Sequence, residues 1–139
     1  MKQEFYNLQI NTIGQKLYDF TDQTIKWIKE NKFKNGIINL SIQHTSASLI
    51  IQENADPDVQ TDLINYFNNL APMNNELYIH NAEGKDDMPA HIKSALTNNQ
   101  ISLSVRNCKL LLGKWQGIFL FEHRLKNQTR TIIHHYLGD

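Results

Sequence analysis

The chain has 139 residues, a length that predicts a single domain, residues 1–139, able to fold without a disulfide or a metal. Fourteen basic and fourteen acidic residues cancel, so we expect no attraction to nucleic acid or to a membrane surface. The lone cysteine, Cys108, and the lack of a signal peptide or of a span of roughly 20 apolar residues predict a cytoplasmic protein.

The N-terminal quarter of the chain is predicted to form a strand and a helix. Residues alternate in polarity from Glu4 to Ile10, which is typical of a strand with one buried face. Asp19, Thr21 or Asp22 then caps a helix, and Gly36 lies just past its end. We expect these two elements to be scaffold.

A polar corner is predicted between the next two strands. A period-two pattern from Ile37 to His44 indicates a strand whose apolar face His44 continues. A second strand, Leu49–Asn54, follows, so the two form a hairpin or one bent strand. The corner then holds four polar side chains: His44, Thr45, Ser46 and Ser48.

The segment after this corner is predicted to be a packing helix. Asp56 supplies a cap, Pro57 suits the first helical position, and the pattern stops before Pro72. Its apolar stripe consists of Val59, Leu63, Phe67 and Leu70. A loop through residues 73–81, with a possible short strand at 77–79, leads onward.

The stretch Glu83–Lys93 combines acids, lysines, a histidine, a glycine and a proline. Asp86 and Asp87 are candidate caps of a short helix, in which Asp87 and His91 lie four apart on one face. This arrangement indicates either a carboxylate that orients an imidazole near an anion-attracting helix start, or simply a capped helix with a solvated, charged first turn. The residues expected to be buried on this helix are Met88, Ile92, Ala95 and Leu96.

The remainder of the chain is predicted to be rich in strands. Gln100–Arg106 alternates and pairs, after a turn, with Leu110–Gly113. Gln116–Arg124 contains four consecutive large apolar residues, as expected of a strand buried on both faces, and Thr129–Leu137 is the last strand. The order of elements predicts an α+β fold, mainly an antiparallel sheet or sandwich covered by two longer helices and one short helix.

Two groups of polar residues lie on these last strands. Glu122, His123 and Arg124 end the most buried strand, where they mark either the rim of a site or an exit into solvent. His134 and His135 face opposite ways and are predicted to be surface or edge residues rather than ligands.

Two kinds of site can be assembled from these residues. Three imidazoles with an open coordination position suit a catalytic divalent ion, either zinc or magnesium, although histidines satisfied within the fold are an alternative. The three candidates, each at an element end, are His44, His91 and His123. Hydroxyl and cationic groups that could grip a phosphate are Thr45, Ser46, Ser48, Lys93 and Arg124.

The chain resembles the YjbQ family, whose members are described as secondary thiamine-phosphate synthases. The resemblance covers nearly the whole chain in family order. It is carried by the segments 43–49 (QHTSASL), 53–57 (ENADP), 83–93 (EGKDDMPAHIK), 113–118 (GKWQGI) and 122–124 (EHR). Lys114 stands where threonine is common in the family, and Gln52 where asparagine is usual.

This resemblance implies an α+β homotrimer with polar clefts shared between subunits. The associated reaction joins hydroxymethylpyrimidine diphosphate to a thiazole phosphate and releases diphosphate. It is a side activity in the family, so the small phosphorylated metabolite that serves as the physiological substrate stays open.

With the resemblance, the polar residues are assigned roles as a hypothesis. His44, His91 and His123 surround the reacting centre or a divalent ion, Glu122 and either Asp86 or Asp87 orient them, and Arg124 binds phosphate. Two alternatives use the same residues: a metal-dependent phosphatase or other hydrolase, and a non-catalytic binder of a phosphorylated metabolite.

Overall fold

The computed structural model describes residues 1–139 as an α+β fold with eight strands and three α-helices. In chain order the elements are β1 (Lys2–Thr12), β2 (Lys16–Asp19), α1 (Thr21–Glu30), β3 (Asn35–Ile42), β4 (Ala47–Glu53), α2 (Pro57–Leu70), the 3-10 turn η1 (Asn75–Leu77), α3 (Asp87–Leu96), β5 (Gln100–Arg106), β6 (Lys109–Leu110), β7 (Gln116–Glu122) and β8 (Gln128–Gly138). The predicted fold class is confirmed, although α1 and α3 have equal lengths of 10 residues.

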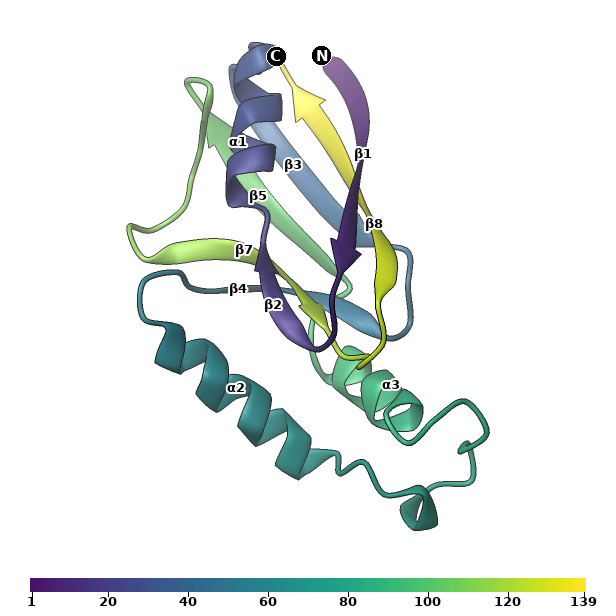
Figure 1. Cartoon of the computed structure of the whole chain (residues 1–139). Helices are drawn as coiled ribbons and strands as arrows, with labels where there is room; N and C mark the ends of the chain where they lie inside the picture. The colour runs from purple at the N-terminus through teal and green to yellow at the C-terminus, as the bar shows by residue number, and fades with distance from the viewer.

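The strands form two antiparallel sheets (Figure 1). The larger has the order β1-β8-β3-β5-β6, and the smaller has the order β2-β7-β4. β3 and β4 therefore belong to different sheets, and the hairpin considered for them is wrong: the chain bends from one sheet into the other between Ile42 and Ala47. This crossing places His44 beyond the end of β3, between the sheets.

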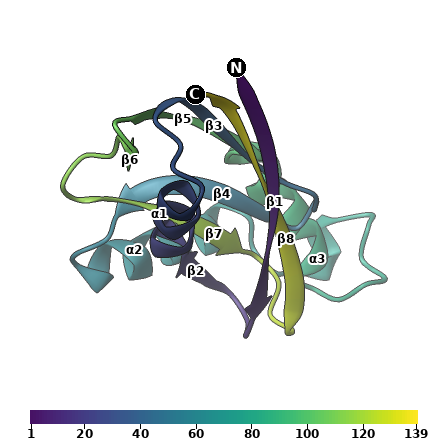
Figure 2. The same cartoon turned by 90° about the horizontal axis from the view of Figure 1, so that it is seen from above.

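The main core lies between the sheets and α1. Seen from above, the larger sheet curves around this helix (Figure 2). Phe20, Ile28 and Phe33 pack there against strand residues such as Ile38 and Leu40. Burial of these side chains is the main stabilising contribution of this layer.

β7 is buried on both faces, as its apolar run predicts. Ile118 and Leu120 join the main core. Phe119 and Phe121 point to the opposite face, where they form a second cluster with Leu17. Phe67 of α2 packs against this second cluster, which confirms α2 as a packing helix. Leu70, the last residue of the predicted stripe, is instead exposed.

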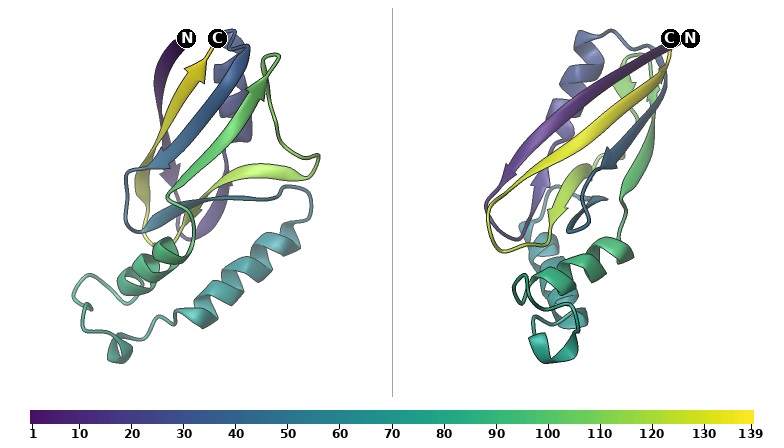
Figure 3. Two further views of the ribbon diagram at one scale, coloured as in Figure 1. Left: turned by 180° about the vertical axis from the view of Figure 1, so that it is seen from behind. Right: turned by 90° about the vertical axis from the view of Figure 1, so that its right-hand side faces the viewer.

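The helices α2 and α3 lie together at the end of the molecule opposite the chain termini (Figure 3). No residue of α2 is fully buried, so this helix is only half covered by the rest of the chain. No helix has the length and apolar character needed to cross a membrane.

Two sequence predictions differ from the structure in detail, and one strand was not predicted. The residues of β2 were not assigned to any element, and the possible strand at 77–79 is absent. His134, predicted at the surface or an edge, is fully buried beneath α1, where its Nε2 lies 2.8 Å from Thr24 Oγ1. The prediction that it faces away from His135 holds, because His135 stacks on Phe5 at the outer side of the sheet.

Candidate functional site

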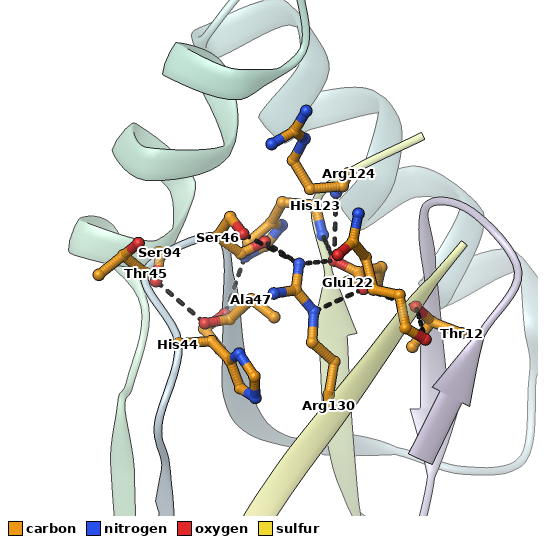
Figure 4. Close-up of polar contacts among 12 residues, drawn as sticks. Thr12, His44, Thr45, Ser46, Ala47, Ser94, Glu122, His123, Arg124 and Arg130 are labelled. Carbon is orange, nitrogen blue, oxygen red and sulfur yellow. Dashed lines mark hydrogen bonds and ion pairs between the residues drawn. The ribbon is translucent and has the colours of Figure 1, made fainter. Parts of the chain in front are cut away.

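Glu122, a predicted catalytic residue, is fully buried at the end of β7. Its two carboxylate oxygens accept hydrogen bonds from Arg130, at 2.7 Å from Nε and 2.6 Å from Nη2 (Figure 4). Thr12 Oγ1 donates at 2.6 Å, and the backbone N–H groups of residues 123 and 124 donate as well. Groups of the chain itself therefore satisfy the hydrogen-bonding capacity of this carboxylate. These hydrogen bonds link β1, β7 and β8.

Arg130 is a residue that sequence reasoning missed. It occupies an ordinary position in an alternating strand, so nothing in the pattern distinguishes it from a surface residue. Its Nη2 also donates to Ser46 Oγ at 2.9 Å. Ser46, predicted to bind phosphate, is thus held by a guanidinium whose other partner is Glu122.

His123 is fully buried and lies 2.9 Å through Nε2 from Ser48 Oγ. Burial lowers the pKa of His123 to about 3, with further lowering by the positive charges of Lys93 and Arg130. Its Nδ1 is buried without a hydrogen-bond partner. The imidazole is neutral at physiological pH, and both His123 and Ser48 are buried and do not line the cavity described below.

His44 lies at the corner between the sheets and is half-buried. Its Nε2 accepts a hydrogen bond from the backbone N–H of Thr131 at 2.9 Å, so a proton on the neutral ring is at Nδ1. Burial lowers the pKa of His44, as does the charge of Arg130, while Glu122 opposes the shift. His44 lines a cavity of about 290 Å³ together with Thr45, His91, Ser94, Ala95 and Asn99.

Arg124 holds the loop before α3 against the end of β7. Its Nε donates to Asp86 Oδ2 at 3.0 Å, its Nη1 to Asp87 Oδ1 at 2.6 Å, and its Nη2 to the carbonyl of Glu83 at 3.0 Å. All three guanidinium nitrogens thus have partners within the chain. Arg124 is a positioning group for the two acids in this structure, whereas the sequence predicted a phosphate ligand.

The carboxylates of the two acids at the start of α3 do not cap the helix but bond to groups on other elements. Asp86 stands at the N-cap position without a side-chain capping bond, and its Oδ2 accepts from the backbone N–H of Leu125 at 2.9 Å. Burial raises the pKa of each acid, but the opposing interactions prevail and both values lie below the ordinary one. For Asp86 these interactions come from Leu125 and Arg124, and for Asp87 from His80, Arg124 and His91. Both acids are therefore ionised at physiological pH.

The buried carboxylate of Asp87, at the start of α3, lies between two imidazoles. Its Oδ2 accepts from His80 Nε2 at 2.7 Å and lies 3.4 Å from His91 Nε2. The pairing of Asp87 with His91 agrees with their predicted position on one helical face. His80 was not a predicted site residue, because it lies in a polar loop without periodicity and nothing local signals its approach to Asp87.

Lys93 is fully buried, and its Nζ donates to Asn68 Oδ1 of α2 at 2.6 Å. Burial lowers the pKa of Lys93 to about 8, although the charge of Asp86 opposes the shift. The prediction for the buried face of α3 is partly wrong, since Ala95 and Leu96 are exposed while Asp87 and Lys93 are buried. Polar partners on neighbouring elements outweigh the apolar pattern of so short a helix.

The structure therefore divides the predicted site residues into two groups. Asp87, His91, Thr45 and His44 lie around the cavity and its rim. The imidazoles of His44, His91 and His123 do not converge on one point, and the cluster with metal-ligand spacing consists of His80, Asp87 and His91. The residues held in contacts within the chain are Ser46, Ser48, Lys93, Glu122, His123 and Arg124.

Comparison with known proteins shows similarity over almost the full chain. A family model described as UPF0047 protein YjbQ-like matches residues 6–139. The UPF0047 protein sll1880 of Synechocystis is 46% identical over 132 residues, which cover 95% of this chain and 90% of the relative. The UPF0047 protein YjbQ of Salmonella typhimurium is 46% identical over 100 residues, which are 72% of each chain.

Solved structures share the same fold. The conserved hypothetical protein TT1486 of Thermus thermophilus superimposes with a TM-score of 0.81 at 29% identity, covering 92% of this chain and 97% of its own. A YbjQ-like protein of unknown function from Sulfolobus solfataricus gives a TM-score of 0.86 at 24% identity over 99% of this chain and 100% of its own.

Proposed function

Because the chain belongs to the YjbQ-like UPF0047 family, we propose that it is a transferase acting on a small phosphorylated metabolite in the cytoplasm. Its proposed secondary activity is that of a thiamine-phosphate synthase, which joins hydroxymethylpyrimidine diphosphate to a thiazole phosphate. One observation carries the proposal: a buried, ionised Asp87 positions two imidazoles, and one of these, His91, lines the polar cavity.

The proposed reaction needs charge neutralisation more than proton transfer. The thiazole ring nitrogen bonds to the methylene carbon of the pyrimidine while the carbon–oxygen bond to diphosphate breaks, and the electron pair departs with diphosphate. The cavity contains no lysine or arginine, and Arg124 and Lys93 are bound within the chain. Within one chain, the positive charge therefore comes from an imidazolium or from a divalent ion, which when bound would stabilise the departing diphosphate.

The other polar groups of the cavity supply orientation. Thr45, Ser94 and Asn99 offer hydroxyl and amide groups to a substrate. The ring of His44 has a fixed tautomer, with the proton of the neutral form at Nδ1. A volume of about 290 Å³ lies at the small end of ligand pockets, so the cavity of one chain has room for one of the two heterocyclic substrates.

A hydrolase is the second candidate, and the exposure of His80 favours it. The side chain of His80 is 49% exposed, so water reaches the polar rim that it forms with Asp87. Water could then replace the thiazole nitrogen as nucleophile. A non-catalytic binder of the same metabolites would show thermal stabilisation by ligand without any turnover.

Diphosphate release measured with and without the thiazole phosphate separates these candidates. The transferase requires both substrates and forms thiamine phosphate, detected by mass spectrometry, whereas a hydrolase releases phosphate or diphosphate from one substrate alone. His91→Ala is expected to slow turnover by on the order of 100-fold or more. The matched control His135→Ala should react like the parent, and an unaffected rate in His91→Ala would contradict the assignment.

We also propose that the chain assembles as a homotrimer. Large apolar side chains in and after α2 are exposed in the single chain, which supports burial against other copies. They include Tyr66, Leu70, Leu77 and Ile79. Leu77 and Ile79 lie within three residues of His80, so assembly would place a neighbouring copy close to the proposed site.

A further inference from the structure

We propose that His80, Asp87 and His91 bind one divalent transition-metal ion of the zinc class. Their ligand atoms, two imidazole nitrogens and one carboxylate oxygen, all lie within 4.8 Å of one another. Two histidines and a carboxylate, with a further position open, are a donor set used by catalytic zinc sites. The assignment rests on donor geometry alone and stands whether or not the transferase reaction is found.

The hydrogen bonding of His91 leaves an electron pair directed at the proposed site. Its Nδ1 lies 3.1 Å from the carbonyl oxygen of Thr45, and a carbonyl can only accept, so Nδ1 carries a proton. In the neutral ring, Nε2 then carries a lone pair and can only accept a hydrogen bond. This nitrogen lies 3.4 Å from Asp87 Oδ2, which is also an acceptor. Two acceptors at this separation repel each other unless a cation, either a proton on Nε2 or a metal ion, lies between them.

The observed spacing fits a tetrahedral ion. With zinc–ligand bonds of about 2.0–2.1 Å, two ligands of a tetrahedral site lie roughly 3.3–3.4 Å apart. The separation between His91 and Asp87 has this value, whereas His80 is hydrogen-bonded to Asp87 at 2.7 Å. An entering ion would displace the proton of this hydrogen bond, and the half-exposed side chain of His80 has room to move back.

The groups behind the ligands are those that metal sites use to orient them. Arg124 Nη1 holds Asp87 Oδ1 at 2.6 Å, which leaves Oδ2 for the ion. The Thr45 carbonyl fixes the ring of His91, as backbone carbonyls do for many ligating histidines. Of the three charged groups at the start of α3, Asp87 is the one whose second oxygen, Oδ2, faces only imidazoles, because Arg124 bonds to Oδ1.

The donor set also selects the kind of ion. Magnesium and calcium prefer shells made entirely of oxygen ligands, whereas imidazole nitrogen suits zinc and its neighbours in the first transition row. Because His91 also lines the cavity, the open coordination position would lie at the cavity rim. A ligand with phosphate oxygens in that cavity could then complete the coordination of the ion.

Isothermal titration of the chelator-stripped full chain with zinc chloride tests this site without any substrate. We expect one ion per chain, with affinity reduced in His80→Ala and His91→Ala by at least on the order of 10-fold, the loss that even an outer partner causes. His135→Ala removes a histidine from the outer side of the sheet and should bind like the parent. Circular dichroism checks folding, and His80→Ala is the safer variant because its side chain is half exposed.

Two results would overturn the site. The first is the absence of saturable zinc binding by the folded parent chain. The second is an affinity of His80→Ala equal to those of the parent and of His135→Ala, because the ion would then bind elsewhere. Neither result involves turnover, so each is distinguishable from a failure of the proposed transferase activity.

Discussion

At the scale of single residues, several polar side chains with the chemistry of a catalyst act as structural ties. Glu122 and Arg130 are 0% and 5% exposed and bond through both carboxylate oxygens. A glutamate at the end of a buried strand looks the same in the sequence whether it meets a substrate or a guanidinium eight residues away. The sequence therefore locates this polar junction but does not reveal its role.

Removing one partner of this buried pair should strongly destabilise the fold. Arg130→Met leaves the Glu122 charge buried without its main partner, at an expected cost of about 3–5 kcal/mol of unfolding free energy. The double variant Glu122→Gln, Arg130→Met should recover part of that loss. Urea denaturation measures both values.

An exposed ion pair provides the control for this prediction. Lys26 and Glu30 are 73% and 62% exposed, so Lys26→Met should change stability by no more than about 0.5 kcal/mol. A loss in Arg130→Met as small as that in Lys26→Met would show that the buried pair contributes little.

Buried histidines should make stability depend on pH. The folded-state pKa values of His123 and His134 lie at about 3 and about 4, below the ordinary 6.5, because burial disfavours the charged ring. At a pH between the folded-state pKa of each histidine and its ordinary pKa of 6.5, the unfolded chain binds more protons than the folded chain. Stability is therefore full above pH 6.5 and falls as the pH drops from 6.5 towards 4.

Variants isolate the contribution of His134. His134→Gln keeps a polar group near Thr24 and should flatten the fall in urea midpoint across this window, whereas His135→Gln should leave the slope as in the parent. Equal slopes in His134→Gln and the parent would refute this source of the pH dependence.

At the scale of elements, α3 and the loop before it show what a local pattern can predict. The helix, the proximity of Asp87 to His91 and the polar corner near Thr45 follow from local spacing. The buried face of α3 does not, because Lys93 is buried by its partner Asn68, which lies 25 residues earlier in the chain. Contacts between distant elements decide which face of so short a helix is covered.

Gly84 should be the least replaceable residue of this loop. Its φ of +106° disfavours any side chain, and an added Cβ would lie 3.0 Å from Asp86 Oδ1. We expect Gly84→Ala to lower the unfolding free energy by about 1–3 kcal/mol, measured by thermal denaturation.

Gly113→Ala is the matched control for this change. Gly113 lacks a positive φ, and its nearest neighbour is the flexible end of Gln116 at 3.2 Å, so the loss should be smaller. Equal losses in the two variants would show that the Gly84 backbone is not specially constrained.

At the scale of the whole molecule, the site depends on a topology that local patterns leave open. Alternation predicts β3 and β4 as strands, but their membership of different sheets follows from pairing with β8 and β5 on one side and with β7 on the other. The crossing between them brings Thr45 next to His91, 46 residues further on. His80 joins through a loop without any periodic signal, which is why the predicted metal ligands contained only one of the three clustered residues.

The proposed homotrimer can be tested directly in solution. Light scattering coupled to size exclusion should give three times the mass of the chain, because the apolar residues around α2 and η1 would otherwise stay exposed. A mass equal to that of one chain at all concentrations would contradict the assembly.

Zinc-edge anomalous diffraction from crystals of the chain soaked with zinc tests the central claim most directly. The account predicts one strong peak about 2.0–2.1 Å from His80 Nε2, Asp87 Oδ2 and His91 Nε2, with His80 moved away from its 2.7 Å contact with Asp87. A peak confined to other histidines, or an intact His80–Asp87 hydrogen bond with no peak beside it, would contradict it.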